Sequence, residues 1–447
     1  MSKGQGRFSR RGFLLGAAAG GAAGAFLGAG GVELYRRWFA ETRRTYPRGL
    51  EPIVHVPKRF TGKTRELPDA PLGIPGPFPG RVVEVHDPRS VVQGAIQSER
   101  VQAMLDRGMR ELTGAPDAVQ AWQRFFQRGE RVGIKVNPVG YARRADVVGV
   151  ISSFPVIMAI VNGLKLAGIP PRDVVLFERY ADEFRAAGYE RFVERELPEV
   201  RWYASAVTGG NVQVDLEGRD VRDGKRFPAD PHVVGYDERI FKRLDYKVPE
   251  LPDSEPLAYE SHVSRILTDE KSVDVQKIIT IPLLKDHRSA GITIALKNMS
   301  HGMASNVART HTGTAAHENR CGTFTPQIVA LDPIRSKCVL HVLDALIGVY
   351  EGGPGNWNPS WGTWEQRSLF VATDPVAMDH VGWDILDGVR ARHGWAPVAR
   401  MGVAGNNRSG TEAFHLRQPE HVPLAEVLGL GIFDPSRIEH RRIQLQG

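Results

Sequence analysis

The stretch that decides the fold begins with RVGIKV at residues 131–136, a short apolar run that ends at Asn137. FPVIMAIVNGLKLA follows at 154–167, with apolar residues recurring at the spacing of a helix. DVVLF at 173–177 is again typical of a strand. A strand, a helix and a second strand in this order predict a parallel pair joined by a crossover helix.

The same alternation resumes in the C-terminal half of the chain. Strands are expected at 277–284, 338–343 and 368–372, and helices at 291–299 and 374–389. The second helix has a capping aspartate and a proline in its first turn. The chain therefore predicts an α/β fold with a mainly parallel sheet covered by helices.

Two segments interrupt or precede this pattern. Residues 205–274 are rich in charges, Pro and Gly, and predict a polar insertion within the body at 80–447. Residues 33–79 are basic and rich in Pro, which predicts an extended linker.

The N-terminal segment 1–32 resembles a twin-arginine export signal. Arg10 and Arg11 precede Gly12–Val32, an uncharged run dominated by Gly and Ala. An ordinary transmembrane helix is the alternative, because about 21 uncharged residues just span a bilayer. We expect the twin-arginine machinery to export the protein to a periplasmic or extracytoplasmic compartment. The segment is then either cleaved or kept as the only membrane anchor.

The net positive charge of the chain comes from its N-terminal part. The net charge is +7, but Met1–Arg65 contains 13 Lys and Arg against 3 Asp and Glu, a local charge of +10. The residues from Glu66 onward therefore carry −3. A mildly acidic body argues against a nucleic-acid partner.

The cysteine content limits the cofactors. Cys321 and Cys338 are the only cysteines, so an intrinsic iron–sulfur cluster is not expected. A single disulfide between them remains an open alternative. A divalent metal would have to use His and carboxylate ligands.

Polar residues follow the predicted strands, at the edge of the sheet where ligands bind in open α/β folds. These positions supply Asn137, Glu178, Lys285, His287, Asp344 and Asp374, and the helix expected at 291–299 supplies Lys297 and Asn298. His301 follows Asn298 at helical spacing, so both are expected to face the same crevice. The two lysines would bind or polarise negative charge, the two histidines would handle protons or a metal, and the two aspartates would orient them. The alternative for each residue is a simple strand end or a helix cap.

A second signal is the group of His287, His301, His311 and His317. Imidazole is a common metal ligand and the usual base near neutral pH, so all four are candidate metal ligands. Their spacing does not match the zincin pattern. The alternative is a surface loop that happens to carry histidines.

The third signal is YEGGPGNW at 350–357. Gly352, Gly353 and Gly355 permit close approach of the backbone to a cofactor or ligand, and the tryptophans that follow would cover it as a lid. Alternatively, the glycines form turns and the tryptophans pack.

The order and spacing of several motifs resemble the domain of unknown function 362 family over about 130–388. The motifs are K-x-N at 135–137, P-L-L-K-D-H at 282–287, A-L-K-N-M-S-H-G at 295–302, V-L-D-A-L-I-G at 342–348 and T-D-P-V-A-M-D at 373–379. The family's lysine–threonine–histidine signature appears as Lys285-Asp286-His287, which keeps the lysine and histidine but loses the hydroxyl. The resemblance implies no settled activity.

These signals together predict an exported enzyme that acts on a small anionic or carbonyl-bearing molecule, with a metal as an optional aid. The alternative is a non-catalytic binding or accessory subunit of an envelope complex, which would work through the surface around Trp357–Trp364. Convergence of Lys285, His287, Asn298 and Asp374 on one concavity would favour the enzyme, whereas scattering would favour the binding subunit.

Overall fold

The computed structural model describes most of the chain from residue 72 onward. The described residues are 72–446 without 144–145, 209–213, 220–229, 246–255, 270, 272, 312–319, 396 and 399–418. The predicted signal at 1–32, most of the predicted linker at 33–79, and His317 lie outside the described residues. Within the described part of the chain, no helix is both long and apolar enough to span a membrane.

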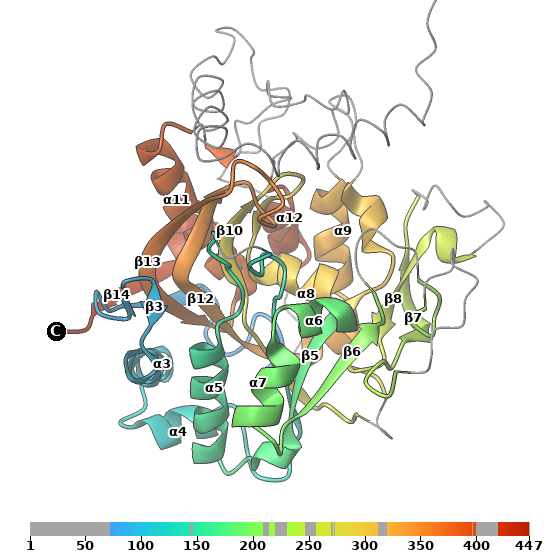
Figure 1. The fold of residues 1–447 in the computed structure, drawn as a ribbon, viewed down its shortest axis with the longest axis horizontal. Helices are drawn as coiled ribbons and strands as arrows, with labels where there is room; N and C mark the ends of the chain where they lie inside the picture. The colour runs from blue at the N-terminus through green and yellow to red at the C-terminus, as the bar shows by residue number, and fades with distance from the viewer. Residues whose placement is uncertain are drawn as a thin grey trace, which may run out of the picture. The chain divides into compact units, whose positions relative to one another are not determined.

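A large sheet organises the molecule (Figure 1). Its strands are β1 (Arg81–His86), β4 (Val132–Lys135), β5 (Val174–Tyr180), β6 (Arg201–Ala206), β9 (Lys277–Thr280), β10 (Leu283–His287), β11 (Gly291–Thr293), β12 (Cys338–Glu351), β13 (Gly362–Ala372) and β14 (Glu439–Gln444). The order is β14-β1-β13-β12-β9-β4-β5-β6, with β10 and β11 added beside β12. From β12 to β6 the strands are parallel, whereas β13 is antiparallel to both of its neighbours. The predicted α/β class with a mainly parallel sheet is confirmed.

Helices cover both faces of the sheet. One face packs against α3 (Ser98–Thr113), α4 (Ala118–Gln123), α5 (Phe154–Leu166), α6 (Ala181–Ala186) and α7 (Tyr189–Glu196), and the other against α8 (Ala295–Met303), α9 (Arg320–Val329), α10 (Asp332–Lys337), α11 (Pro375–Arg392) and α12 (His421–Val427). Leu176 and Phe177 are neighbours in β5, yet they join the apolar cores on opposite faces. This alternation is what a strand covered on both sides requires.

The strand order reverses next to β4. The chain adds β5 and β6 on one side of β4, and β9 and β12 on the other. Ligands of open α/β sheets bind beyond the carboxyl ends of the strands at such a reversal. In this protein Lys135, Glu178 and Lys285 lie at that edge of the sheet.

Two predicted elements are wrong in detail. The single strand expected at 277–284 is two strands, β9 and β10, because Pro282 lacks the N–H that would continue the ladder and β10 instead pairs with β12 and β11. The helix expected at 291–299 is α8, which starts only at Ala295, because residues 291–293 pair with β10 as β11.

The region predicted as a polar insertion contains a separate antiparallel pair, β7 (Tyr236–Arg243) and β8 (Glu260–Ser264). It lies beyond the β6 edge of the main sheet (Figure 1) and is tied to it by a hydrogen bond of 2.7 Å between Ser205 Oγ and Ser264 Oγ.

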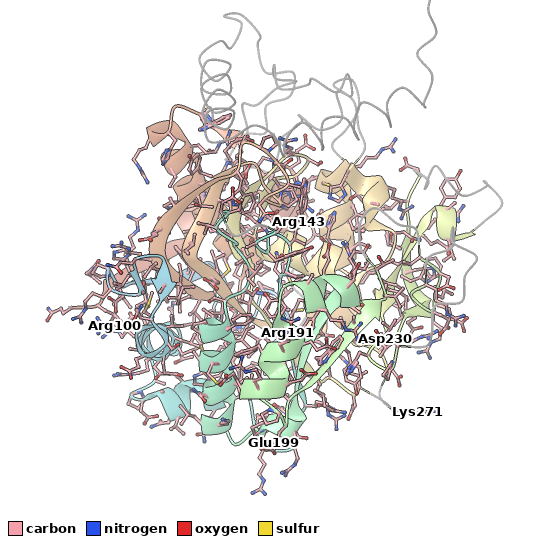
Figure 2. The ribbon with its side chains drawn as sticks, viewed as in Figure 1. Arg100, Arg143, Arg191, Glu199, Asp230 and Lys271 are labelled. Carbon is pink, nitrogen blue, oxygen red and sulfur yellow. The ribbon has the colours of Figure 1, made fainter. Side chains whose placement is uncertain are left out.

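Charged side chains of both signs project from the described surface, among them Arg191, Glu199 and Lys271 (Figure 2). Solvated charges of this kind are ordinary. Buried ones are not, and several of them gather at the carboxyl edge of the sheet.

Candidate active site

A cluster of lysine and histidine side chains lies at the carboxyl edge of the sheet. It comprises Lys285 and His287 on β10, Lys297, Asn298 and His301 on α8, and His311 on the 3-10 helix η3 (Val307–His311). The His311 ring lies 5.4 Å from that of His287 and 5.2 Å from that of His301, measured between centroids. Lys297 Nζ is 3.5 Å from His311 Nε2. Predicted site residues from three separate segments therefore lie together.

Helix α8 is held in place from outside its own sequence. Its first two N–H groups, of Ala295 and Leu296, donate to the carboxylate of Asp379 on α11 at 2.7 and 3.2 Å. At the other end, a Cβ on Gly302 would lie 2.3 Å from Cε of Lys135, so glycine is needed for this close approach. Both contacts fix the position of Lys297, Asn298 and His301.

A buried ion pair lies beneath the same helix. Lys135 Nζ on β4 is 2.6 Å from Glu178 Oε2 on β5 and 3.5 Å from Asn298 Oδ1. The Nδ2 group of Asn298 is buried without a hydrogen-bond partner in the described residues. A ligand that accepts a hydrogen bond would satisfy this group.

The glycine-rich segment packs directly on β10. The N–H of Gly353 donates to Asp286 Oδ1 at 2.6 Å, and a Cβ on Gly353 would lie 1.9 Å from the Asp286 carbonyl oxygen. Gly352 has a φ of +88°, and a Cβ on Gly355 would collide with the Trp357 ring. These contacts place the segment beside Lys285 and His287.

Burial shifts the pKa values of the two lysines. It lowers the pKa of Lys285 to about 7, and the charge of Lys297 acts in the same direction. It also lowers the pKa of Lys297 to about 8. Both amines therefore exchange protons much closer to neutral pH than an exposed lysine does.

Two residues that sequence reasoning missed belong to this site. Arg179, at the end of β5, donates from Nη1 to the carbonyl of His301. Glu183 lies on α6 next to Arg179, and burial raises its pKa to about 7 against the opposing charge of Arg179. Arg179 lies within β5 and Glu183 lies on α6, and no local pattern in the sequence distinguishes either position.

The histidines differ in what they can bind. His287 Nδ1 accepts hydrogen bonds from the N–H groups of Ser289 and Ala290 at 3.0 and 3.1 Å, so the neutral ring carries its proton on Nε2. In this arrangement His287 is a donor and not a metal ligand. By contrast, ligand atoms of His301, His311 and Cys321 all lie within 4.8 Å of one another. Cys321 and Cys338 are not joined by a disulfide, so the open alternative of a bridge between them is not realised.

The remaining predicted residues make contacts that stabilise the fold. Asp374 accepts hydrogen bonds from Val376 and Ala377 as the cap of α11, and from Gly80 and Ile432. Hydrogen bonds join the ends of β4 and β12 to the start of α5. The N–H of Asn137 donates to Ser152 Oγ, and the N–H of Ser153 donates to Asp344 Oδ2. The named hydrogen bonds of Asp374 include no residue of the lysine–histidine cluster.

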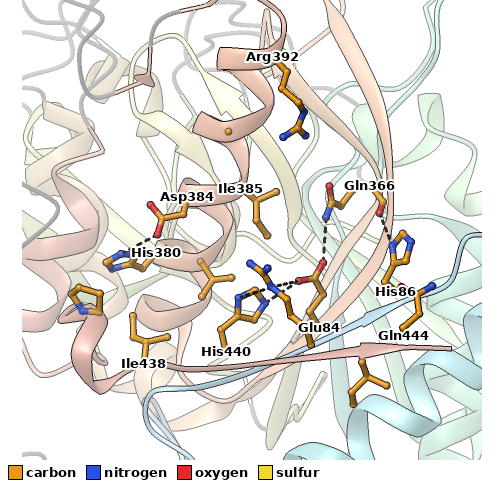
Figure 3. A pocket seen from close by; sticks show the side chains of 15 residues that line it. Glu84, His86, Gln366, His380, Asp384, Ile385, Arg392, Ile438, His440 and Gln444 are labelled. Atoms are coloured by element: carbon orange, nitrogen blue, oxygen red, sulfur yellow. Dashed lines mark hydrogen bonds and ion pairs between the residues drawn. The ribbon is translucent and has the colours of Figure 1, made fainter.

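A separate cavity of about 650 Å³ lies between α11 and the β1–β14 edge of the sheet (Figure 3). Its wall contains a contact of 2.9 Å between His440 Nε2 and Glu84 Oε2, and one of 3.6 Å between His380 Nε2 and Asp384 Oδ2. None of the predicted site residues lines it.

Comparison with known proteins gives one match. Residues 235–384 match the model of the family described as domain of unknown function (DUF362). The match supports the resemblance over a shorter range than the predicted 130–388. It includes β10, α8, η3 and α9, and with them the lysine–histidine cluster, but not Lys135, Arg179 or Glu183. No curated protein and no solved structure matches the chain.

Proposed function

We propose that the protein is an exported enzyme that performs acid–base chemistry on a small anionic or carbonyl-bearing molecule. The observation that carries this proposal is the lysine–histidine cluster at the carboxyl edge of the sheet, where burial lowers the pKa of Lys285 to about 7. The charge of Glu183 acts on Lys285, and burial raises the pKa of this carboxyl group to about 7. General acids and bases work best when their pKa lies near the operating pH. Perturbed pKa values of this kind cluster at functional sites.

The surrounding groups favour a negatively charged substrate. Lys297 and Arg179 supply positive charge, and the unpartnered Nδ2 of Asn298 supplies a further donor. Lys285 in its neutral form would accept a proton, and protonated Glu183 would donate one. A carbonyl oxygen held by the cations would be polarised at the same time.

The alternative of a non-catalytic binding subunit has one specific observation in its favour. Trp357 is 50% exposed and stacks with Arg143, although much of the rest of the glycine-rich segment is buried. A binding subunit would use this surface and would have no need of Lys285. Turnover that depends on Lys285 separates the two functions.

Replacing Lys297 by methionine is expected to weaken anion binding about 10- to 100-fold, because a hydrogen bond to a charged group contributes roughly 1.5–3 kcal/mol. Thermal unfolding in the presence of sulfate, phosphate and small carboxylates measures this effect. A ligand at about 100 times its dissociation constant stabilises a protein by about 2.7 kcal/mol. Lys165→Met, which removes an exposed lysine at the end of α5, is the matched control. Equal stabilisation of both variants would contradict the proposed binding site.

The same measurement has an expected pH dependence. Sulfate keeps its charge across the range, whereas Lys285 loses its proton and Glu183 becomes negative as the pH rises through about 7. Both changes disfavour an anion, so stabilisation by sulfate should be larger at pH 6 than at pH 8. Lys285→Met should reduce this dependence to the part that Glu183 and Lys297 contribute. A profile that is flat in the unmodified protein would count against the role of Lys285.

Export is expected to depend on the arginine pair. Changing Arg10 and Arg11 together to lysine should leave folded protein in the cytoplasm, since the twin-arginine machinery reads the pair and not only its charge. Cell fractionation followed by detection of the folded protein measures this. A double variant that still crosses the membrane would show that the segment is another kind of signal.

A further inference from the structure

Three side chains with metal-binding atoms meet on one side of the lysine–histidine cluster. His301 comes from α8, His311 from η3 and Cys321 from the first turn of α9. Their ligand atoms lie within 4.8 Å of one another, and Cys321 Sγ is 3.9 Å from His301 Nε2. The three positions are ten apart in the sequence, so they form no short-spacing metal-binding motif.

The separation between Cys321 Sγ and His301 Nε2 is close to that of a tetrahedral zinc site. With Zn–S of about 2.3 Å and Zn–N of about 2.0–2.1 Å, tetrahedral angles place a sulfur and a nitrogen ligand about 3.6 Å apart. The observed distance of 3.9 Å between Sγ and Nε2 is near this value. The other pairs of ligand atoms lie within 4.8 Å, so metal binding requires the side chains to rotate toward one another.

The surroundings of His301 suit a ligand. Nδ1 of His301 lies 2.9 Å from Ser300 Oγ, and Ser300 Oγ lies 3.3 Å from Thr325 Oγ1. Metal-binding histidines use their second nitrogen in this way, which fixes the ring. Nε2 of His301 lies 2.9 Å from Thr310 Oγ1, and Cys321 Sγ lies 3.2 Å from the Thr310 carbonyl oxygen, so a bound metal would replace these two hydrogen bonds. His311 also has a nitrogen, Nδ1, that is buried without a hydrogen-bond partner in the described residues.

We propose that His301, His311 and Cys321 bind a single zinc ion. Imidazole and thiolate are soft or borderline ligands that favour Zn²⁺ over Mg²⁺ and Ca²⁺. Three protein ligands leave a fourth position open, which is the arrangement of catalytic zinc sites. The thiolate is essential, because its negative charge offsets the repulsion between the metal ion and the neighbouring Lys297 and Arg179.

The zinc site deepens the proposed function and rests on it for its chemical role. A substrate oxygen at the open position would be polarised by the metal, while the nearby cations would hold its charge. Metal binding itself is measured without substrate. A negative result in the anion-binding test therefore contradicts the acid–base site but not the zinc site. A negative result in the metal titration contradicts the zinc site but not the acid–base site.

The experiment is titration of the purified, metal-stripped full chain with Co²⁺, which reports zinc sites through its absorption spectrum. We expect one equivalent to bind, with a thiolate-to-cobalt charge-transfer band and the visible bands of tetrahedral cobalt. Zn²⁺ should displace the ion, and excess Mg²⁺ should not. Cys321→Ser should remove the charge-transfer band and weaken metal binding more than about 100-fold. Substitution of residues that only hydrogen-bond to metal ligands already lowers metal affinity about 10–100-fold. Cys338→Ser, which alters the other buried thiol, should leave the spectrum unchanged.

A second measurement keeps the proposal testable if Cys321→Ser does not fold. In Cys338→Ser the only thiol is Cys321, and Zn²⁺ should slow its alkylation by at least tenfold. An unchanged alkylation rate overturns the proposal. So does an octahedral cobalt spectrum, or a charge-transfer band that persists in Cys321→Ser.

Discussion

Replacing Arg390 by methionine is expected to lower the free energy of unfolding by about 3–5 kcal/mol, the cost of breaking a buried ion pair by removing one partner. Arg390 Nη1 lies 2.8 Å from Glu351 Oε2 and 3.9 Å from Asp286 Oδ2, and all three side chains are completely buried. The substitution leaves two carboxylates in the interior without this cation. Denaturation by guanidinium chloride, followed by circular dichroism, measures the loss.

The control is Arg392→Met on the same helix, where the side chain is exposed and the expected change is within about 0.5 kcal/mol. The double variant Arg390→Met/Glu351→Gln should recover part of the lost free energy of unfolding. In this variant the Glu351 carboxylate, which Arg390 no longer neutralises, is also removed. Equal stability of the Arg390 and Arg392 variants would show that the buried cation does not stabilise the fold. The ion pair anchors β10 through Asp286, so the position of Lys285 and His287 also depends on it.

The second large effect is expected from Glu178→Gln, which removes the partner of Lys135. The two side chains are 1% and 5% exposed, and the ion pair at 2.6 Å is therefore almost completely buried. We expect a loss of about 3–5 kcal/mol at neutral pH. Burial already lowers the pKa of Lys135, and Glu178 is the main opposing cause, so the variant lowers that pKa further.

This pKa shift predicts the sign of a pH dependence. In the variant, folded Lys135 loses its proton while the unfolded chain keeps it up to its usual pKa of about 10.4. The unfolded state then binds more protons, so the stability of the variant rises with pH and its deficit shrinks between neutral and alkaline pH. Glu130→Gln is the matched control, because the pair of Glu130 with Lys277 has the same separation of 2.6 Å but is partly exposed. Its expected cost is at most about 1 kcal/mol. A deficit that grows with pH would contradict the assignment to Lys135.

Much of the fold follows from local patterns. The helix expected at 154–167 is α5, and the strands on either side of it are β4 and β5, because the periodicity of apolar residues directly reflects which side chains face the core. The cap and proline before α11 were equally local, and Asp374 does accept hydrogen bonds from the start of that helix. The same local role explains why Asp374 belongs to a cap and not to the lysine–histidine cluster.

The candidate site could be predicted only in part. Lys285, His287, Lys297, Asn298 and His301 were expected from strand ends and helical spacing, and they do lie together. Glu183, Arg179 and Cys321 were not expected, because nothing in their own neighbourhood distinguishes them from surface or core residues. Asp379, which caps α8 from a helix more than 80 residues away, could not be foreseen from the sequence around α8.

The sequence by itself determined the alternation of strands and helices, the edge of the sheet at which polar groups collect, and the location of the net positive charge in the N-terminal part. The tertiary structure decided which polar groups meet and what state they are in. His301 and Cys321 come together only when α8 packs against α9. Lys285 and Glu183 titrate near neutral pH only because the surrounding chain removes them from water. Periodicity is a property of neighbouring residues, whereas burial depends on segments that are distant in sequence, and burial is what sets the chemistry of this site.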